Sequence, residues 1–116
     1  MDDTGNKIKA LALHLECKVE DIIEEGYGFT CETEPGEYQV LTDSEADKAF
    51  DEYMDSLMDE CILSEIPERL RRYFDEKAYK RDVLISDGRG PSLAVYDGEE
   101  NEQKIGKEYF FIYRTN

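Results

Sequence analysis

The strongest constraint on the fold is a long amphipathic helix in the middle of the chain. Thr42 and Glu45 match a capping box, in which each side chain accepts a hydrogen bond from a free backbone N–H group at the helix start. Apolar residues then recur at intervals of three or four positions from Ala46 to Ile62 and define one continuous stripe. A helix with such a stripe must bury it against another element, so we expect it to pack on a β-sheet.

The segments on either side supply the other expected elements. Helical periodicity predicts a short N-terminal helix over residues 8–15, a further turn or two over residues 19–23, and a second long helix over residues 67–81. β-Favouring runs bounded by turn residues predict strands or strand fragments at residues 27–32, 37–42, 83–85, 93–96 and 109–114. Pro35 and Gly36 favour a turn between the first two strands, which therefore form a β-hairpin.

Length and hydrophobic content favour one core. The chain has 116 residues, of which 40% are hydrophobic, and no repeat, low-complexity tract or linker divides it. We therefore expect a single α+β domain over residues 1–116. Its sheet should be mostly antiparallel with about four to five strands, and the two longer helices and the short N-terminal helix should pack on one face.

The strongly acidic composition restricts the partners that the chain can bind. It has 29 Asp and Glu residues against 14 Lys and Arg residues, for a formal net charge of -15. Such an excess favours solubility and opposes direct binding to a phosphate backbone, so the expected partner is a basic protein surface. The charge is also segregated, because residues 67–81 contain six basic and three acidic side chains.

The cysteine pattern and the hydropathy pattern indicate a cytoplasmic setting in a host cell. The three cysteines are odd in number, widely spaced and without a CxxC pair, which favours reduced thiols over a disulfide framework or a zinc site. No signal peptide pattern is present, and no apolar run is long enough to span a membrane. The sequence leaves the oligomeric state open.

No residue pattern predicts catalysis, a metal or a cofactor. His14 is the only histidine and has no nucleophile and acid arranged around it, and with Cys17 it makes only two possible metal ligands. The turn at residues 88–90 lacks the features of a phosphate-binding loop, although Arg89 could project from it as a contact residue. The acidic segment 97–108 resembles a calcium loop but has Glu102 where the tight turn needs glycine. We therefore expect a non-enzymatic protein.

A regular row of acids follows the polar side of the long helix. Aspartates recur every four residues at positions 43, 47, 51, 55 and 59. A four-residue step rises about 6 Å along a helix, close to the spacing of phosphates on one nucleic-acid strand, so the row could imitate a nucleic-acid backbone. The alternative is an ordinary solvated face whose acids pair with the basic residues of segment 67–81.

Three C-terminal stretches resemble a family of proteins. They are Asp87–Gly90 (DGRG), Tyr96–Glu102 (YDGEENE) and Tyr109–Asn116 (YFFIYRTN), and residues 38–47 (YQVLTDSEAD) extend the likeness. Together they resemble small acidic proteins encoded by bacteriophages and prophages. Pro91 stands where that pattern has a histidine. The resemblance implies a phage or mobile-element origin and carries no catalytic motif.

Such an origin favours an inhibitor of a host nucleic-acid-directed defence system, of the anti-CRISPR or anti-restriction type, that acts as a DNA mimic. The expected partner is then a host nuclease or CRISPR effector. The residues expected to bind it are Asp51, Glu52, Asp55, Asp59, Glu60, Glu99, Glu100 and Glu102. The alternative is a non-enzymatic phage accessory or regulatory protein that binds a host or phage protein through an exposed sheet face at Tyr109, Phe111 and Tyr113.

Overall fold

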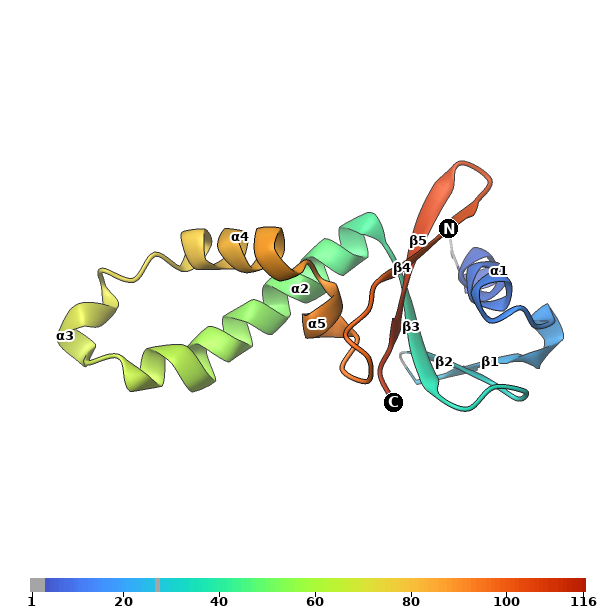
Figure 1. Ribbon diagram of the computed structural model, residues 1–116, viewed down its shortest axis with the longest axis horizontal. Helices are drawn as coiled ribbons and strands as arrows, with labels where there is room; N and C mark the ends of the chain where they lie inside the picture. Colours follow the sequence, from blue (N-terminus) through green and yellow to red (C-terminus); the bar gives the residue numbers. More distant parts are fainter. Residues whose placement is uncertain (1–3, 27) are drawn as a thin grey trace.

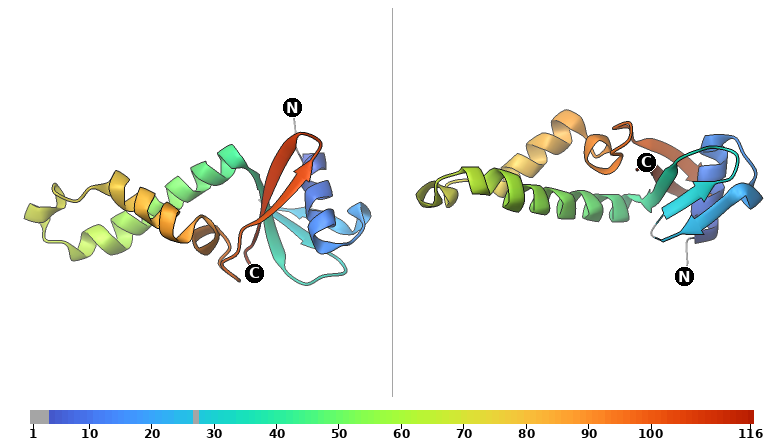
Figure 2. Two further views of the ribbon diagram at one scale, coloured as in Figure 1. Left: turned by 45° about the horizontal axis from the view of Figure 1, so that its top comes forward. Right: turned by 90° about the horizontal axis from the view of Figure 1, so that it is seen from below.

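A helical arm projects from a sheet-based head (Figure 1). The computed structural model describes residues 4–26 and 28–116. We call residues 43–87 the arm and the other described residues the head. The molecule measures 55 × 28 × 26 Å along its principal axes, and the arm accounts for its elongated form (Figures 1 and 2). No helix within the described residues is long and apolar enough to cross a membrane.

One antiparallel sheet of five strands forms the centre of the head, so the expected α+β class is confirmed. The strands are β1 (Ile22–Glu25), β2 (Gly28–Cys31), β3 (Glu37–Thr42), β4 (Asn101–Ile105) and β5 (Glu108–Arg114), in the order β1-β2-β3-β5-β4. The expected hairpin is present, with Phe29 of β2 opposite Tyr38 of β3. Tyr27, the first residue of the expected strand, lies outside the described residues.

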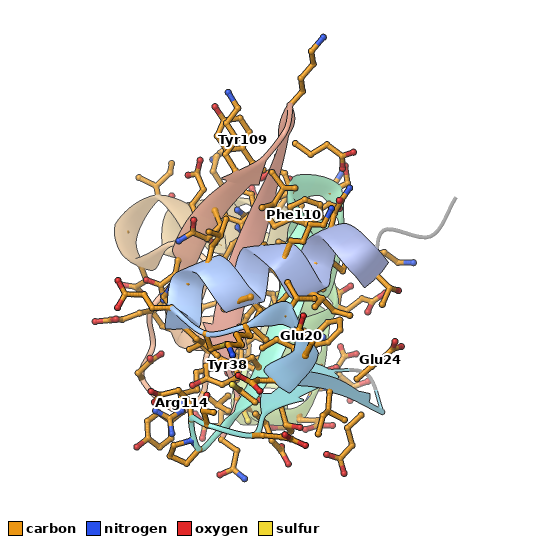
Figure 3. All side chains as sticks on the ribbon, turned by 90° about the vertical axis from the view of Figure 1, so that its right-hand side faces the viewer. Glu20, Glu24, Tyr38, Tyr109, Phe110 and Arg114 are labelled. Atoms are coloured by element: carbon orange, nitrogen blue, oxygen red, sulfur yellow. The ribbon has the colours of Figure 1, made fainter. Side chains whose placement is uncertain are left out.

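Helices cover both faces of the sheet, which corrects the expectation that they share one face. Helix α1 (Thr4–Leu15) buries Leu11 against Val40 and Phe110 on the first face (Figure 3). The opposite face is covered by Ala46 of the arm and by the short helix α5 (Gly90–Leu93). Side chains alternate along a strand, so neighbouring β5 residues belong to different cores: Ile112 to the first and Tyr113 to the second.

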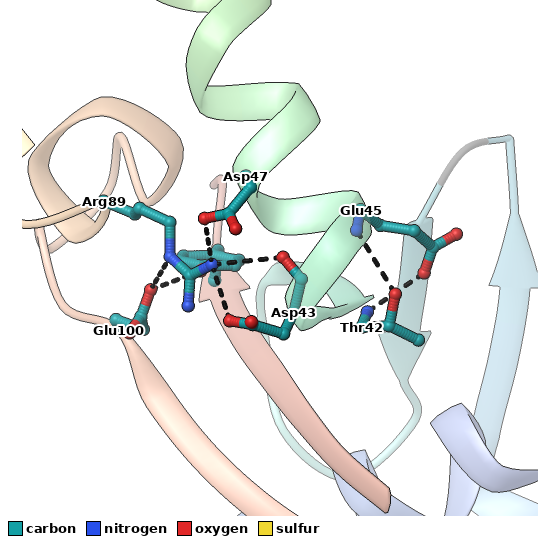
Figure 4. A network of polar contacts seen from close by, with 7 residues as sticks. Thr42, Asp43, Glu45, Asp47, Arg89 and Glu100 are labelled. Carbon is teal, nitrogen blue, oxygen red and sulfur yellow. Dashed lines mark hydrogen bonds and ion pairs between the residues drawn. The ribbon is translucent and has the colours of Figure 1, made fainter. Parts of the chain in front are cut away.

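The long helix begins as the sequence predicts. In α2 (Asp43–Leu57), Thr42 Oγ1 accepts from the Glu45 N–H (3.2 Å) and Glu45 Oε1 accepts from the Thr42 N–H (3.0 Å), so the capping box is present (Figure 4). The helix continues as a π-helical segment, η2 (Met58–Ile62). A π turn holds more residues than an α turn, so side chains beyond Leu57 are rotated relative to the row on α2.

Most of the apolar stripe of α2 packs within the arm, and not on the sheet as expected. Phe50, Met54 and Met58 form a separate core with Phe74 and Val83 from the returning chain. Only the first turns of α2 reach the sheet, because the helix axis runs away from the head (Figure 2). The stripe therefore holds the arm together.

The returning chain differs from the single helix expected over residues 67–81. A 3-10 turn, η3 (Leu63–Glu65), precedes the short helix α3 (Glu68–Arg71) at the tip of the arm. Residues 72–75 are not helical, and α4 (Glu76–Asp87) then runs back toward the head. Asp75 restarts the helix because its carboxylate accepts a hydrogen bond from the Ala78 N–H (3.0 Å) and caps α4.

Three short segments differ from the elements that the sequence predicts for them. Residues 83–85 belong to α4, where Val83 completes the core of the arm. Leu93 ends α5, and residues 94–96 form no strand. Residues 19–23 divide into the 3-10 turn η1 (Val19–Asp21) and the start of β1, because the β-branched Ile22 and Ile23 pair with β2. At residues 83–85, contacts with distant residues of the arm outweigh the local propensity for a strand.

Helix α1 ends in a Schellman motif. Among the described non-glycine residues, only Glu16 has a positive φ (56°). Its N–H donates to Leu13 O (3.3 Å), and the Cys17 N–H donates to Ala12 O (3.0 Å), which is the hydrogen-bond pair of that motif. The motif directs the chain back under the helix and places Cys17 against the sheet.

Replacing Glu16 with glycine should raise the free energy of unfolding by about 1 kcal/mol, since glycine adopts the left-handed conformation without a Cβ clash. Urea unfolding followed by circular dichroism measures the change. Glu16→Ala is the matched control: it removes the carboxylate but keeps the Cβ, so it should bring no such gain. Equal stability of the glycine and alanine variants would contradict this account.

Candidate partner-binding site

An arginine joins the base of the arm to the head (Figure 4). Arg89 Nη1 donates to Asp43 Oδ1 (3.0 Å) and to Asp47 Oδ1 (2.9 Å). Arg89 Nε donates to Glu100 Oε2 (2.8 Å). The guanidinium carbon lies 4.6 Å from the centroid of the Phe111 ring, so the cation also stacks on the sheet. We call Arg89 with its three carboxylates the arginine hub.

Local backbone geometry explains how the hub assembles. Asp43 and Asp47 are one helical turn apart, so both carboxylates lie on the same side of α2. Gly88 ends α4 with φ of 72°, a conformation that favours glycine. A Cβ at Gly90 would lie 2.5 Å from the carbonyl oxygen of Gly98, so only glycine allows this close approach. The two glycines let Arg89 turn inward between them.

The arginine of the hub is buried, and its role is to hold the fold together. Arg89 is 8% exposed. Burial opposes its charge, but the hydrogen bond to Glu100, the negative charge of Glu100 and the hydrogen bond to Asp43 outweigh burial and raise the pKa of Arg89 above its usual value. Burial, reinforced by the hydrogen bond to Glu100, also raises the pKa of Tyr113, so its hydroxyl stays protonated and donates to Glu100 Oε2. Glu100 is thus held by two internal donors.

A second internal cation neutralises part of the acidic row. Lys80 Nζ of α4 lies 2.8 Å from Asp51 Oδ1 and also pairs with Asp55 of α2. Hydrogen bonds to these two carboxylates raise the pKa of Lys80. Among the described residues, Lys80 is the only member of segment 67–81 that pairs with the row. The alternative of pairing with segment 67–81 therefore holds for two of the five aspartates, Asp51 and Asp55. Asp43 and Asp47 are also paired internally, but with Arg89, which lies outside that segment.

The acids of the arm that were expected to bind a partner face solvent. Glu52, Asp59 and Glu60 are exposed and form no ion pair with any described residue. The side chains of Asp51 and Asp55 stay more than half exposed, at 59% and 55%, because one ammonium group cannot cover two carboxylates. We call these five residues of α2 and η2 the acidic ridge.

The head carries the other acids expected to bind a partner, and the structure does not bring them to the ridge. Glu99 is exposed in the loop before β4, and Glu102 is exposed on β4 opposite Phe111 of β5. Glu100 lies in the arginine hub, between the two. Asp59 and Glu60 lie beyond the end of α2, in the half of the arm away from the head (Figure 1). The expected residues therefore form a ridge on the arm and a separate group on the head.

The aromatic residues of β5 are mostly covered. Tyr113 is 0% exposed, and Phe111 lies beneath Arg89, so the expected sheet face at these positions is not available to a partner. Tyr109 alone of the three is open to solvent, at 47% exposure. Helix α5 and the first turns of α2 provide the cover.

Arg89 is the residue whose role sequence reasoning missed. The sequence suggested an outward contact residue, whereas the structure turns it inward. Its two flanking glycines were the visible signal, since they mark a close approach of backbones, and the aspartates at 43 and 47 mark a site for a shared cation. The sequence does not show that the two signals belong to one site, because 42 residues separate Arg89 from Asp47.

The described residues provide no group of three His, Cys, Asp or Glu side chains that could hold a metal ion. Residues 101–105 of the segment compared with a calcium loop form β4. A scan against protein-family models, a search of curated proteins and a search of solved structures found no match to this chain.

Proposed function

We propose that this chain is a non-catalytic protein that docks its acidic ridge onto a basic surface of a partner protein. The single observation that carries the proposal is the acidic ridge: five exposed carboxylates, of which only Asp51 and Asp55 pair with a described cation, Lys80, on a projection that extends away from the head. Like charges at this spacing destabilise an isolated helix by a few tenths of a kcal/mol per pair. A basic partner would remove this repulsion.

The partner class that we propose is the nucleic-acid channel of a host defence nuclease, of the CRISPR or restriction type, in the cytoplasm of the host cell. Such channels are basic, and exposed carboxylates can occupy the positions of phosphates. Asp43 and Asp47 point to Arg89, and so they do not contribute to the mimicry that we propose. In this proposal the carboxylates of the acidic ridge, from Asp51 to Glu60, imitate the phosphates, and the first two aspartates of the row do not.

The ridge can be tested by charge reversal. The triple variant Glu52→Lys, Asp59→Lys, Glu60→Lys should weaken binding to a purified RNA-guided DNA nuclease about 100-fold, because three attractive contacts become repulsive. Competition with fluorescent target DNA, measured at several salt concentrations, reports the binding. Lys80→Met should strengthen binding to the nuclease, since it frees Asp51 and Asp55 for the partner.

The matched control keeps the same change in net charge but places it on the head. Glu20, Glu24 and Glu108 are exposed, and Glu20 and Glu24 lie on the side of the head away from the arm (Figure 3). Reversing these three should change affinity only slightly, through the long-range field. Equal losses in both triple variants, or undiminished competition by the ridge variant, would contradict docking through the ridge. The same binding assay with a restriction nuclease shows which of the two nuclease types the ridge binds.

A hollow on the sheet favours a second candidate, binding of a host or phage protein through the head. The hollow measures about 320 Å³ and lies over the half of the sheet that α2 and α5 leave uncovered. Thr30 and Gln39 contribute to its lining, with Glu25 and Glu37 beside them. If the partner binds here, Gln39→Arg should abolish capture while the ridge variant keeps it.

A further inference from the structure

Two cysteines from different parts of the head lie in contact. Cys17 Sγ and Cys31 Sγ are 3.4 Å apart, and both are free thiols. Cys31 is buried in the first core, whereas Cys17 is only partly buried and packs against that core. Spacing along the chain did not predict this pair, since 14 positions separate the two residues.

Backbone structure holds each sulfur in place. The Schellman motif at the end of α1 fixes the backbone of Cys17 through its N–H, which donates to Ala12 O. Cys31 ends β2 and is paired with Ile22 of β1. The contact is therefore built by a helix cap on one side and a strand on the other.

The surroundings make the two thiols chemically different. Burial opposes ionisation of Cys31, but hydrogen bonds from the Thr33 hydroxyl, the backbone N–H groups of Thr33 and Glu34, and Cys17 outweigh burial and lower the pKa of Cys31. Burial and the hydrogen bond to Cys31 raise the pKa of Cys17 to about 11. The pair thus resembles the arrangement in which one thiolate is stabilised by a neighbouring thiol.

We propose that Cys17 and Cys31 form a reversible oxidative modification site, at which a peroxide converts the two thiols into one disulfide. The sulfurs must approach from 3.4 Å to about 2.05 Å, a movement that side-chain rotation and a small shift of residues 16–18 can supply. The site lies on the head and is independent of the acidic ridge. Cys61 is exposed on η2 of the arm and takes no part.

The reaction balances with peroxide as the only oxidant. The Cys31 thiolate attacks one peroxide oxygen, the O–O bond breaks, and hydroxide leaves, so the sulfur becomes a sulfenic acid. Cys17 then loses its proton and attacks that sulfur, the S–S bond forms, and the S–O bond breaks. Hydroxide takes up the proton as water. Two thiols and one peroxide yield one disulfide and two waters.

The disulfide would connect the end of α1 to β2 across a short loop. A cross-link of this kind restricts the unfolded chain more than the folded one. We therefore expect the oxidised form to have a higher midpoint of thermal unfolding than the reduced form, by roughly 5–10 °C. A disulfide that strained the head would lower the midpoint instead.

The test uses the full chain with Cys61→Ser, so that only the proposed pair can react. Hydrogen peroxide at a small excess should remove both thiols and lower the intact mass by about 2 Da. Trypsin digestion without reductant should give a peptide linked through Cys17 and Cys31, and dithiothreitol should release it. In denaturing urea the same treatment should form the linkage much more slowly, because folding supplies the contact.

Two single variants complete the test. Each variant, in the Cys61→Ser background, should form no disulfide and so show no loss of about 2 Da. Cys17→Ser should leave Cys31 to form sulfenic or sulfinic acid, whereas Cys31→Ser should leave Cys17 mainly as the thiol. The proposal is overturned if the folded chain retains both thiols, if both sulfurs oxidise separately without a linked peptide, or if the linkage forms between molecules. Equal rates in folded and unfolded chains would also overturn it.

Discussion

Replacing Arg89 with alanine is expected to lower the free energy of unfolding by about 2–3 kcal/mol, because it removes the charge-assisted hydrogen bonds that one buried guanidinium donates to three carboxylates. Asp43 and Asp47 would then lose their shared cation, and of its two internal donors Glu100 would keep only the Tyr113 hydroxyl. The stacking of the guanidinium on Phe111 would be lost as well. Because the hub joins the arm to the head, its loss should lower the stability of both parts.

Urea unfolding of the variant, followed by circular dichroism, measures the effect. Arg81→Ala is the matched control, since Arg81 is exposed on α4 and forms no ion pair with a described residue, and its effect should stay within about 0.5 kcal/mol. Arg89→Lys should still destabilise, because a lysine cannot reproduce the forked contacts of Nε and Nη1. A loss below about 1 kcal/mol for Arg89→Ala would show that the hub is dispensable.

A double-mutant cycle assigns the cause. In Asp43→Asn, Asp47→Asn the repulsion between carboxylates is reduced, so Arg89→Ala should cost less in that background than in the original chain. Equal costs in the two backgrounds would mean that the arginine acts through Glu100 and through packing on Phe111, and not through the two aspartates.

Replacing Phe110 with alanine should lower the free energy of unfolding by about 3–5 kcal/mol. Phe110 is 0% exposed in the core between α1 and the sheet, and its strand has hydrogen-bonded neighbours on both sides, at Thr42 and Gln103. The surrounding strands cannot collapse into the space that the ring leaves. The loss is a large share of the stability of a typical domain, about 5–15 kcal/mol.

Met54→Ala provides a contrast within the arm. Met54 is 1% exposed, but its core consists of arm residues together with Leu93 and contains no strand. We expect hydrogen exchange to become faster in α4 while the amides of β3 and β5 stay protected. Phe110→Ala should accelerate exchange in both regions. If Met54→Ala exposed the sheet to the same extent, arm and head would be one cooperative unit.

Local signals predicted the elements that depend on neighbouring residues. The capping box at Thr42 and Glu45, the hairpin between β2 and β3, and the strand at residues 109–114 all occur as expected. The first two depend on hydrogen bonds or turn geometry within a few residues, and the strand is visible from its β-favouring aromatic composition. The acidic row was also visible, because its four-residue repeat needs no knowledge of the fold.

The candidate site was predicted less well. The eight acids expected to bind a partner are on two separate parts of the molecule, and Glu100 is held by Arg89 and Tyr113. The sequence showed the apolar stripe from Ala46 to Ile62, but it did not show which element packs on that stripe. An apolar stripe must be buried, and the pattern alone does not indicate which element buries it. The same uncertainty led to the expectation that all helices share one face of the sheet.

The sequence by itself determined the α+β class, the start of the long helix, the acidic excess and the need to cover one helical stripe, since these follow from composition, periodicity and contacts between near neighbours. Only the tertiary structure decided that the stripe packs into an arm, that Arg89 and Lys80 neutralise part of the acidic row, and that Cys17 meets Cys31. Those pairings join residues that lie far apart in the chain. Their energy depends on distance in space, which no local pattern specifies.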